Sequence, residues 1–229
     1  MFMKTERITI EGRECRIDEH DSAEVMLIQP ADISSLEHMD KLTAELDERS
    51  GKPYILVTFA VTEWNNELSP WESPAVFGKD SFGGGAEETL AYVTQSLLPY
   101  IREHYKESEH LPVIIGGYSL AALFSLWAVY RTDVFSACAA ASPSVWFPKW
   151  PEFIKDRRPF AECIYLSLGD REEKVKNPVM SAVGDNIRSQ YDTLKNDRLR
   201  CTLEWNEGNH FKDVSIRCAR AFAWCIGAF

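Results

Sequence analysis

The order of apolar segments predicts an α/β fold with a mostly parallel central sheet and helices on both faces. Short runs rich in β-branched and aromatic residues alternate with helix-like stretches along the chain. No Pro/Gly/Ser-rich linker and no internal repeat interrupts this alternation, so we expect a single domain over residues 1–229. With 229 residues, 45% of them hydrophobic, the chain can bury a sizeable core.

The predicted elements follow one another in chain order. Strands are expected at 5–10, 23–29, 53–61, 112–117, 135–141, 163–168 and 200–206, and helices at 33–49, 86–105, 119–131, 178–196 and 213–226. The helix at 119–131 is apolar nearly all round, which predicts that it is buried. No clear helix separates the first two strands, which makes them candidates for an antiparallel pair at one edge of the sheet.

Charge and composition exclude several kinds of protein. The net charge is −10 and no Lys/Arg cluster offsets it, so nucleic acid is not an expected partner. No apolar run reaches the roughly 18 residues of a membrane span. The N-terminal MFMKTERITI lacks an apolar signal segment, so we expect a cytoplasmic protein. The six cysteines form no C-x-x-C pair, which predicts reduced, buried thiols and no zinc site.

The strand at 112–117 leads into the motif Gly117-Tyr118-Ser119-Leu120-Ala121. This is G-x-S-x-G with alanine in the last place, set between an apolar strand and a strong helix, as a nucleophile elbow requires. Ser119 is therefore the candidate nucleophile. The Leu120 N–H at the start of the helix is a candidate oxyanion donor. The alternative is that Ser119 only caps a buried helix.

A serine hydroxyl needs an adjacent base to act as a nucleophile. Of the five histidines, two precede the motif in polar or helical segments, and two lie near the opposite end of the nucleophile strand. His210 follows the last predicted strand, at the edge of the sheet where ligands bind in such folds. Gly208 just before it allows a sharp turn. His210 is therefore the candidate general base.

Three acids compete for the third position in the loop after the strand at 163–168. Asp170 directly follows Gly169 and has the least reach, whereas Glu172 and Glu173 are longer. The spacing from Gly169 to Glu172, with Val175 beyond, matches G-x-x-D-x-x-V, so we predict Glu172 as the acid, with Glu173 as the alternative. A Ser-His pair without a third member also remains open.

The chain resembles the putative esterase group of α/β-hydrolases, which includes esterase D, feruloyl esterases and ferric-siderophore esterases. The resemblance rests on GGYSLAALFSLWA, VFSACAAASPSVWFP with its S-P-S-x-W motif, LSLGDREE and EGNHF, and covers about residues 50–226. It implies the α/β-hydrolase fold without a lid, a Ser-His-acid triad and hydrolysis of carboxylic esters.

In that fold a second oxyanion N–H follows the strand at 53–61, and we expect it near residues 61–63, with Thr62 as the candidate. Trp64, Trp71, Tyr118 and Trp146 are the candidate substrate-binding residues. Ordinary packing beneath a long loop is the alternative for the three tryptophans.

The predicted function is a serine hydrolase that cleaves a small-molecule carboxylic ester through an acyl-enzyme. The mechanism requires no metal and no organic cofactor, and we expect neither nucleic acid nor a membrane as a partner. An acyltransferase with the same triad and a non-catalytic binding module of the same fold are the alternatives. The sequence does not indicate an oligomeric state.

Overall fold

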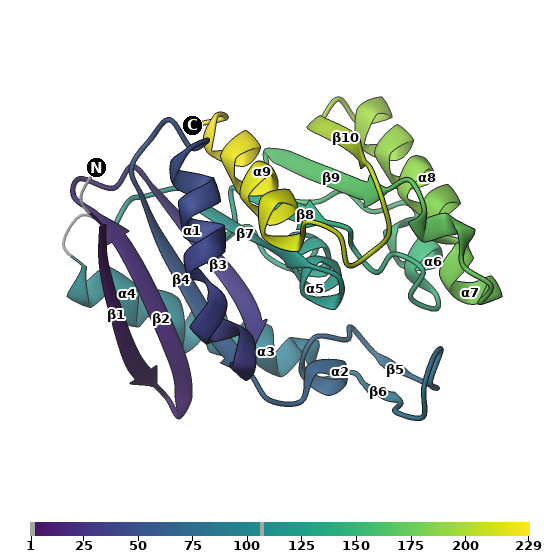
Figure 1. Ribbon diagram of the computed structural model, residues 1–229, viewed down its shortest axis with the longest axis horizontal. Helices are drawn as coiled ribbons and strands as arrows, with labels where there is room; N and C mark the ends of the chain where they lie inside the picture. Colours follow the sequence, from purple (N-terminus) through teal and green to yellow (C-terminus); the bar gives the residue numbers. More distant parts are fainter. Residues whose placement is uncertain (1–2, 106–107) are drawn as a thin grey trace.

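The computed structural model describes residues 3–105 and 108–229. An eight-stranded sheet in the order β1-β2-β4-β3-β7-β8-β9-β10 runs through its centre (Figure 1). The strands are β1 (Met3–Ile10), β2 (Arg13–His20), β3 (Val25–Asp32), β4 (Tyr54–Val61), β7 (Val113–Tyr118), β8 (Ala137–Ala141), β9 (Cys163–Gly169) and β10 (Arg200–Asn206). From β4 to β10 in this order every neighbouring pair is parallel, whereas β2 runs antiparallel to β1 and β4.

Helices cover both faces of the sheet (Figure 1). Helices α1 (Asp40–Asp47) and α9 (Val214–Ile226) share one core cluster with one face of the strands. Helices α3 (Ala86–Tyr92), α4 (Leu98–His104), α5 (Leu120–Ala128) and α8 (Val183–Asn196) contribute to the cluster on the other face. The predicted α/β class, a mostly parallel sheet with helices on both faces, is confirmed.

The structure corrects the prediction at the antiparallel edge. No strand was predicted at the position of β2, which is the true antiparallel partner of β1. The strand predicted at 23–29, observed as β3, lies instead between β4 and β7 in the parallel part. Hydrophobic patterning does not reveal β2, because its buried positions include Arg16 and Asp18. Their side chains form an ion pair with an Nε–Oδ2 distance of 2.9 Å.

Several predicted helices are interrupted. The predicted helix at 33–49 divides into a 3₁₀ helix, η1 (Ile33–His38), and α1. The predicted helix at 86–105 contains a π-helical turn, η2 (Val93–Leu97), between α3 and α4. The predicted helix at 178–196 divides into α7 (Pro178–Ser181) and α8. Every residue of α5 is buried, as its composition predicted. Among the described residues, no helix is both long enough and apolar enough to cross a bilayer.

The junction of β7 and α5 forms a tight strand–turn–helix. Ser119 has φ 59° and ψ −121°, a conformation that is uncommon for a residue with a side chain. A Cβ atom added to Gly117 would lie 2.8 Å from the Cβ of Ala121, which is closer than van der Waals contact allows. Gly117 and the small Ala121 therefore let the strand and the helix approach each other on either side of Ser119.

We predict that Gly117→Ala destabilises the fold and lowers activity, because the new methyl group must push β7 and α5 apart. Ala121→Gly alone should cost about 1 kcal/mol of helix stability. The double variant should be less destabilised than the sum of the two single variants, since removing the Ala121 methyl relieves the clash. Thermal or urea unfolding of the four proteins measures this coupling. If the changes in the free energy of unfolding were additive, the clash between the new methyl group and the Ala121 methyl would be refuted.

Candidate active site

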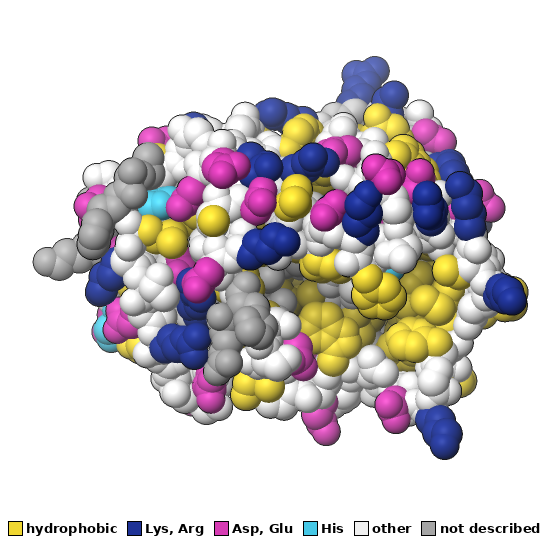
Figure 2. All heavy atoms as spheres, in the orientation of Figure 1, with side chains coloured by type: hydrophobic (Ala, Val, Ile, Leu, Met, Phe, Trp, Pro, Cys, Tyr) yellow, Lys and Arg dark blue, Asp and Glu magenta, His cyan; other side chains and the backbone are white. Residues whose placement is uncertain are grey.

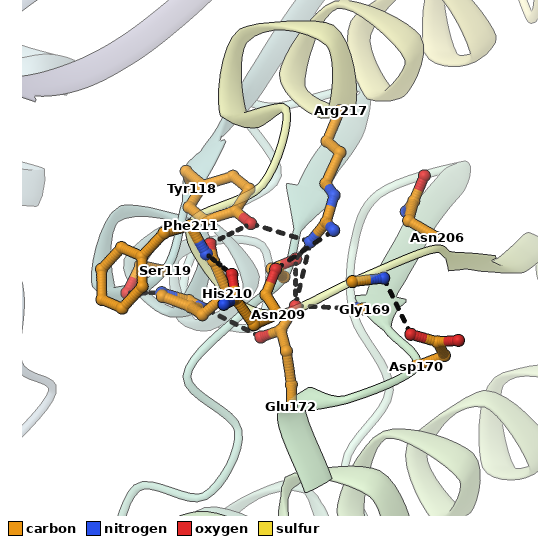
Figure 3. A network of polar contacts seen from close by, with 12 residues as sticks. Tyr118, Ser119, Gly169, Asp170, Glu172, Asn206, Asn209, His210, Phe211 and Arg217 are labelled. Carbon is orange, nitrogen blue, oxygen red and sulfur yellow. Dashed lines mark hydrogen bonds and ion pairs between the residues drawn. The ribbon is translucent and has the colours of Figure 1, made fainter. Parts of the chain in front are cut away.

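The carboxyl ends of three parallel strands bring together the serine, histidine and glutamate singled out in the sequence (Figure 3). Ser119 follows β7, and Glu172 begins the 3₁₀ turn η3 (Glu172–Lys174) after β9. His210 lies in the loop between β10 and α9. Since the strands are parallel, all three loops emerge at the same edge of the sheet.

The three side chains form a continuous chain of hydrogen bonds. His210 Nε2 lies 3.0 Å from Ser119 Oγ, and His210 Nδ1 lies 2.7 Å from Glu172 Oε2. With the ring proton on Nδ1, the imidazole donates to the carboxylate and accepts from the serine hydroxyl. In this arrangement Nε2 can take the serine proton, while the carboxylate fixes the orientation of the ring.

The other oxygen of Glu172 is held by three donors. Oε1 accepts hydrogen bonds from the Gly169 N–H at 2.7 Å, the Ser142 hydroxyl at 2.9 Å and the Arg217 guanidinium at 3.1 Å. Burial alone would raise the pKa of Glu172. The hydrogen bond and charge of His210, with the Gly169 and Ser142 donors, outweigh burial and hold that pKa below its ordinary value. The carboxylate therefore stays ionised beside the imidazole.

The two competing acids have other partners. Glu173 forms an ion pair with Arg188 of α8, with an Nη2–Oε2 distance of 2.8 Å. Asp170 Oδ1 accepts a hydrogen bond of 2.8 Å from the Gly208 N–H. Gly208 itself has φ 106°, which a residue with a side chain rarely adopts. Asp170 thus helps to position the turn that carries the histidine, and neither acid contacts the imidazole.

Arg217 of α9 belongs to this site although the sequence analysis did not single it out. Its side chain is 1% exposed. Besides Glu172, the guanidinium donates to the Tyr118 hydroxyl at 3.0 Å and to the carbonyls of Glu207 and Asn209 at 3.1 and 3.2 Å (Figure 3). Arg217 lies at a core position of the apolar helix VSIRCARAFAWCI. Because a buried charge normally has a partner, this position was the feature of the sequence that could have indicated its role.

The S-P-S-x-W segment after β8 surrounds the serine and the glutamate. The Ser142 hydroxyl bonds Glu172, and Ser144 Oγ lies 3.3 Å from Ser119 Oγ. The Ser144 N–H also donates to the Ser119 carbonyl at 3.1 Å. Trp146 lines the cavity over Ser119. The polar and aromatic positions of this motif therefore all contact the site or its cavity.

The expected oxyanion donors differ in their availability. Leu120 is the first residue of α5, so its N–H has no acceptor within the helix. The assignment of Thr62 was wrong, because its N–H donates to Glu67 Oε1 at 2.7 Å. The Glu63 N–H also donates to that oxygen, at 2.8 Å. Trp64, the first residue of α2 (Trp64–Glu67), is the next backbone donor along the chain and lines the cavity over Ser119.

A largely apolar cavity of about 620 Å³ opens over Ser119. Figure 2 shows hydrophobic side chains gathered in a hollow. In this view the hollow lies below α9 and above the short two-stranded sheet of β5 (Glu72–Ser73) and β6 (Phe82–Gly83). The hydrophobic lining consists of Trp64, Phe77, Phe82, Leu120, Pro143, Trp146, Val175, Met180, Val183 and Phe211. Of the four predicted substrate-binding residues, Trp64 and Trp146 line this cavity.

Trp71 and Tyr118 do not line it, which corrects their expected role. The Trp71 indole N–H donates to the Pro148 carbonyl at 2.9 Å, and its ring packs against Phe147 and Phe153 behind the cavity wall. The Tyr118 hydroxyl donates to the His210 carbonyl at 2.7 Å. Burial raises the pKa of Tyr118 to about 12, so it remains a neutral donor. Tyr118 therefore supports the histidine loop.

Among the residues that the structure describes, no cluster of three or more His, Cys, Asp or Glu side chains is suited to a metal ion. The arrangement of a hydroxyl, an imidazole and a carboxylate in an apolar cavity suits acyl transfer through a serine nucleophile.

Comparison with known proteins gives a family and a fold. Residues 34–195, more than half of the chain, match the family described as Putative esterase. The resemblance inferred from the sequence motifs is thereby confirmed. No curated protein sequence gives a significant match to the chain.

Three solved structures illustrate the fold. An IroE-like serine hydrolase from Shewanella oneidensis has a TM-score of 0.79 and 17% identity, over 99% of this chain and 80% of that chain. Siderophore hydrolase EstA from Aspergillus nidulans has a TM-score of 0.72 and 17% identity, over 99% and 94%. The enterobactin esterase FES from Shigella flexneri has a TM-score of 0.71 and 14% identity, over 100% and 60%. These likenesses confirm the α/β-hydrolase fold.

We predict that Glu172→Gln lowers kcat by about 10²–10⁴-fold, because the amide no longer stabilises the imidazolium or fixes its tautomer. Glu173→Gln is the matched control: it makes the same chemical change one residue later and removes only the ion pair to Arg188. Its kcat should stay within a few-fold of the unmodified enzyme. Steady-state kinetics on one ester substrate would decide. If Glu173→Gln were the impaired variant, the acid would be misassigned.

The lowered pKa of Glu172 also predicts a pH dependence of stability. The carboxyl has a lower pKa in the folded protein than its ordinary value of 4.5, so the unfolded chain binds more protons near that pH. Its stabilising contribution is present above that pH and is lost as the pH falls through the folded-state pKa. The difference in free energy of unfolding between the unmodified protein and Glu172→Gln should therefore shrink below about pH 4.5. Urea unfolding at several pH values measures it, and parallel curves would contradict the assignment.

Proposed function

The chain belongs to the Putative esterase family and is a carboxylic ester hydrolase, and we propose that it works through a Ser119-His210-Glu172 triad and a covalent acyl-enzyme. The observation that carries this proposal is the unbroken hydrogen-bond chain, 3.0 Å from Ser119 Oγ to the imidazole and 2.7 Å from the imidazole to Glu172. Neutral imidazole is a base of suitable strength at physiological pH.

In the acylation step Ser119 Oγ attacks the ester carbonyl carbon while His210 Nε2 takes the hydroxyl proton. The carbonyl oxygen becomes an oxyanion in the tetrahedral intermediate. The intermediate then collapses, the bond to the alcohol oxygen breaks, and His210 returns its proton to the leaving alcohol. Glu172 remains ionised throughout and stabilises the imidazolium that forms twice in each cycle.

Two backbone N–H groups are the candidates for holding the oxyanion. The Leu120 N–H lies at the start of α5, where the helix dipole also favours negative charge. The Trp64 N–H replaces the expected Thr62 N–H, because Glu67 already occupies the latter. Trp64 begins α2 and borders the same cavity as Leu120, which supports this choice.

In the deacylation step a water molecule attacks the acyl-enzyme, and His210 acts first as base and then as acid. The product carboxylic acid leaves and Ser119 is regenerated. An alcohol in place of water would give a new ester by the same steps, so acyl transfer is the chemical alternative.

The apolar cavity favours an ester with a bulky hydrophobic group. Trp64 and Trp146 offer large aromatic surfaces on its walls, and Phe77 and Phe82 pack against Trp146 at ring distances of 5.9 and 6.1 Å. Aromatic walls of this kind bind apolar groups through buried area and directional packing. The cavity volume of about 620 Å³ lies in the range of small-molecule sites.

We predict that a fluorophosphonate probe forms one covalent adduct on the protein and none on Ser119→Ala. Ser144→Ala is the control, because its hydroxyl lies only 3.3 Å from Ser119 Oγ but has no contact with the imidazole. That variant should still be labelled. Intact-mass measurement gives the result, and an adduct that persists in Ser119→Ala but disappears in Ser144→Ala would refute the assignment. Product analysis with a competing alcohol separates hydrolysis from acyl transfer.

A further inference from the structure

The loop after β9 places positive charge at the mouth of the active-site cavity. We call residues 171–176 the mouth loop; Arg171 and Val175 within it line the cavity. The side chains of Arg171, Lys174 and Lys176 are all exposed. The mouth loop therefore places Arg171 at the cavity and two further exposed cations within five residues of it in sequence, in a chain whose net charge is −10.

The acidic groups of the mouth loop do not neutralise these cations. Glu172 is buried and paired with His210 and Arg217, and Glu173 is paired with Arg188. Among the described residues, no ion pair or side-chain hydrogen bond involves Arg171, Lys174 or Lys176. The exposed Asp170 just before the loop bonds the Gly208 N–H instead, so Arg171 remains available to an anion at the cavity.

Among the described residues, the lining of the cavity also lacks an unpaired acidic side chain. Of the lining residues that the structure describes, only Arg171, Glu172 and His210 carry an ionisable group, and Glu172 already has Arg217 as a buried counter-ion. The remaining walls are apolar or uncharged, so they screen a charge less than water does. A guanidinium at such an edge can donate two parallel hydrogen bonds to one carboxylate.

We propose that the preferred ester substrate carries an anionic group, such as a carboxylate, that binds Arg171 at the mouth while the apolar part of the substrate fills the cavity. This inference rests on the proposed function and names the substrate class of the same site. Arg171 makes the direct contact. Lys174 and Lys176 add a positive field that attracts the anion in an otherwise acidic protein.

Two pairs of probe substrates test the proposal, each pair differing in one charge. The para-nitrophenyl monoester of adipic acid against para-nitrophenyl hexanoate places the charge on the acyl half. Para-acetoxybenzoate against para-methylphenyl acetate places it on the alcohol half. In at least one pair, kcat/KM should favour the anionic member by about fivefold or more at low ionic strength. That preference should shrink as salt shortens the Debye length from about 30 Å to about 3 Å.

Arg171→Gln should lower kcat/KM for the anionic probe by at least about fivefold more than for its neutral partner. Arg102→Gln is the matched control, since it removes one exposed positive charge from α4, at the far end of the molecule from α7 and the mouth loop (Figure 1). It should leave the preference intact.

Equal rates for both members of both pairs would overturn the inference. So would an equal loss for both members in Arg171→Gln, or the same loss of preference in Arg102→Gln. These outcomes are distinct from a failure of the proposed function, in which no ester would be hydrolysed and Ser119→Ala would change nothing.

Discussion

The buried ion pair between Arg217 and Glu172 connects the parts of the protein on which the site depends. Arg217 comes from α9, and Glu172 follows β9. The same guanidinium bonds Tyr118 at the end of β7 and two carbonyls in the loop after β10. Loss of either partner would leave an uncompensated charge inside the protein, a change that typically costs about 3–5 kcal/mol. The pair therefore acts as a structural centre for four chain segments: the end of β7, the loops after β9 and β10, and α9.

Parallel topology explains why this small set of contacts suffices. Strands β7, β8, β9 and β10 lie side by side, and their carboxyl ends deliver the nucleophile, the S-P-S-x-W segment, the acid and the histidine loop to one edge. Each loop needs only to be held against its neighbour. Ser142 holds the glutamate, and Asp170 holds the turn at Gly208. The sheet sets the approximate position of each loop, and these side chains hold the loops against one another.

The features that could be predicted from the sequence are those that local chemistry determines. The alternation of elements and the strand–turn–helix around Ser119 depend on short-range patterns, so they are visible in one chain. The G-x-x-D-x-x-V spacing indicates Glu172 over Glu173, and of the two only Glu172 contacts the imidazole, because successive residues of a 3₁₀ turn point in different directions. The buried Arg16–Asp18 pair hides strand β2 from hydrophobic patterning, and Arg217 bonds residues that are far away in the sequence, so neither feature is visible in a local pattern.

The contacts that hold the histidine loop are made mostly to its main chain. Tyr118 and Arg217 bond the carbonyls of residues 207, 209 and 210, and Asp170 bonds the N–H of Gly208. The side chain of Phe211, next to the histidine, is 84% exposed and makes none of these hydrogen bonds. A substitution at position 211 should therefore alter the lining of the cavity while the main-chain contacts of the histidine loop stay in place.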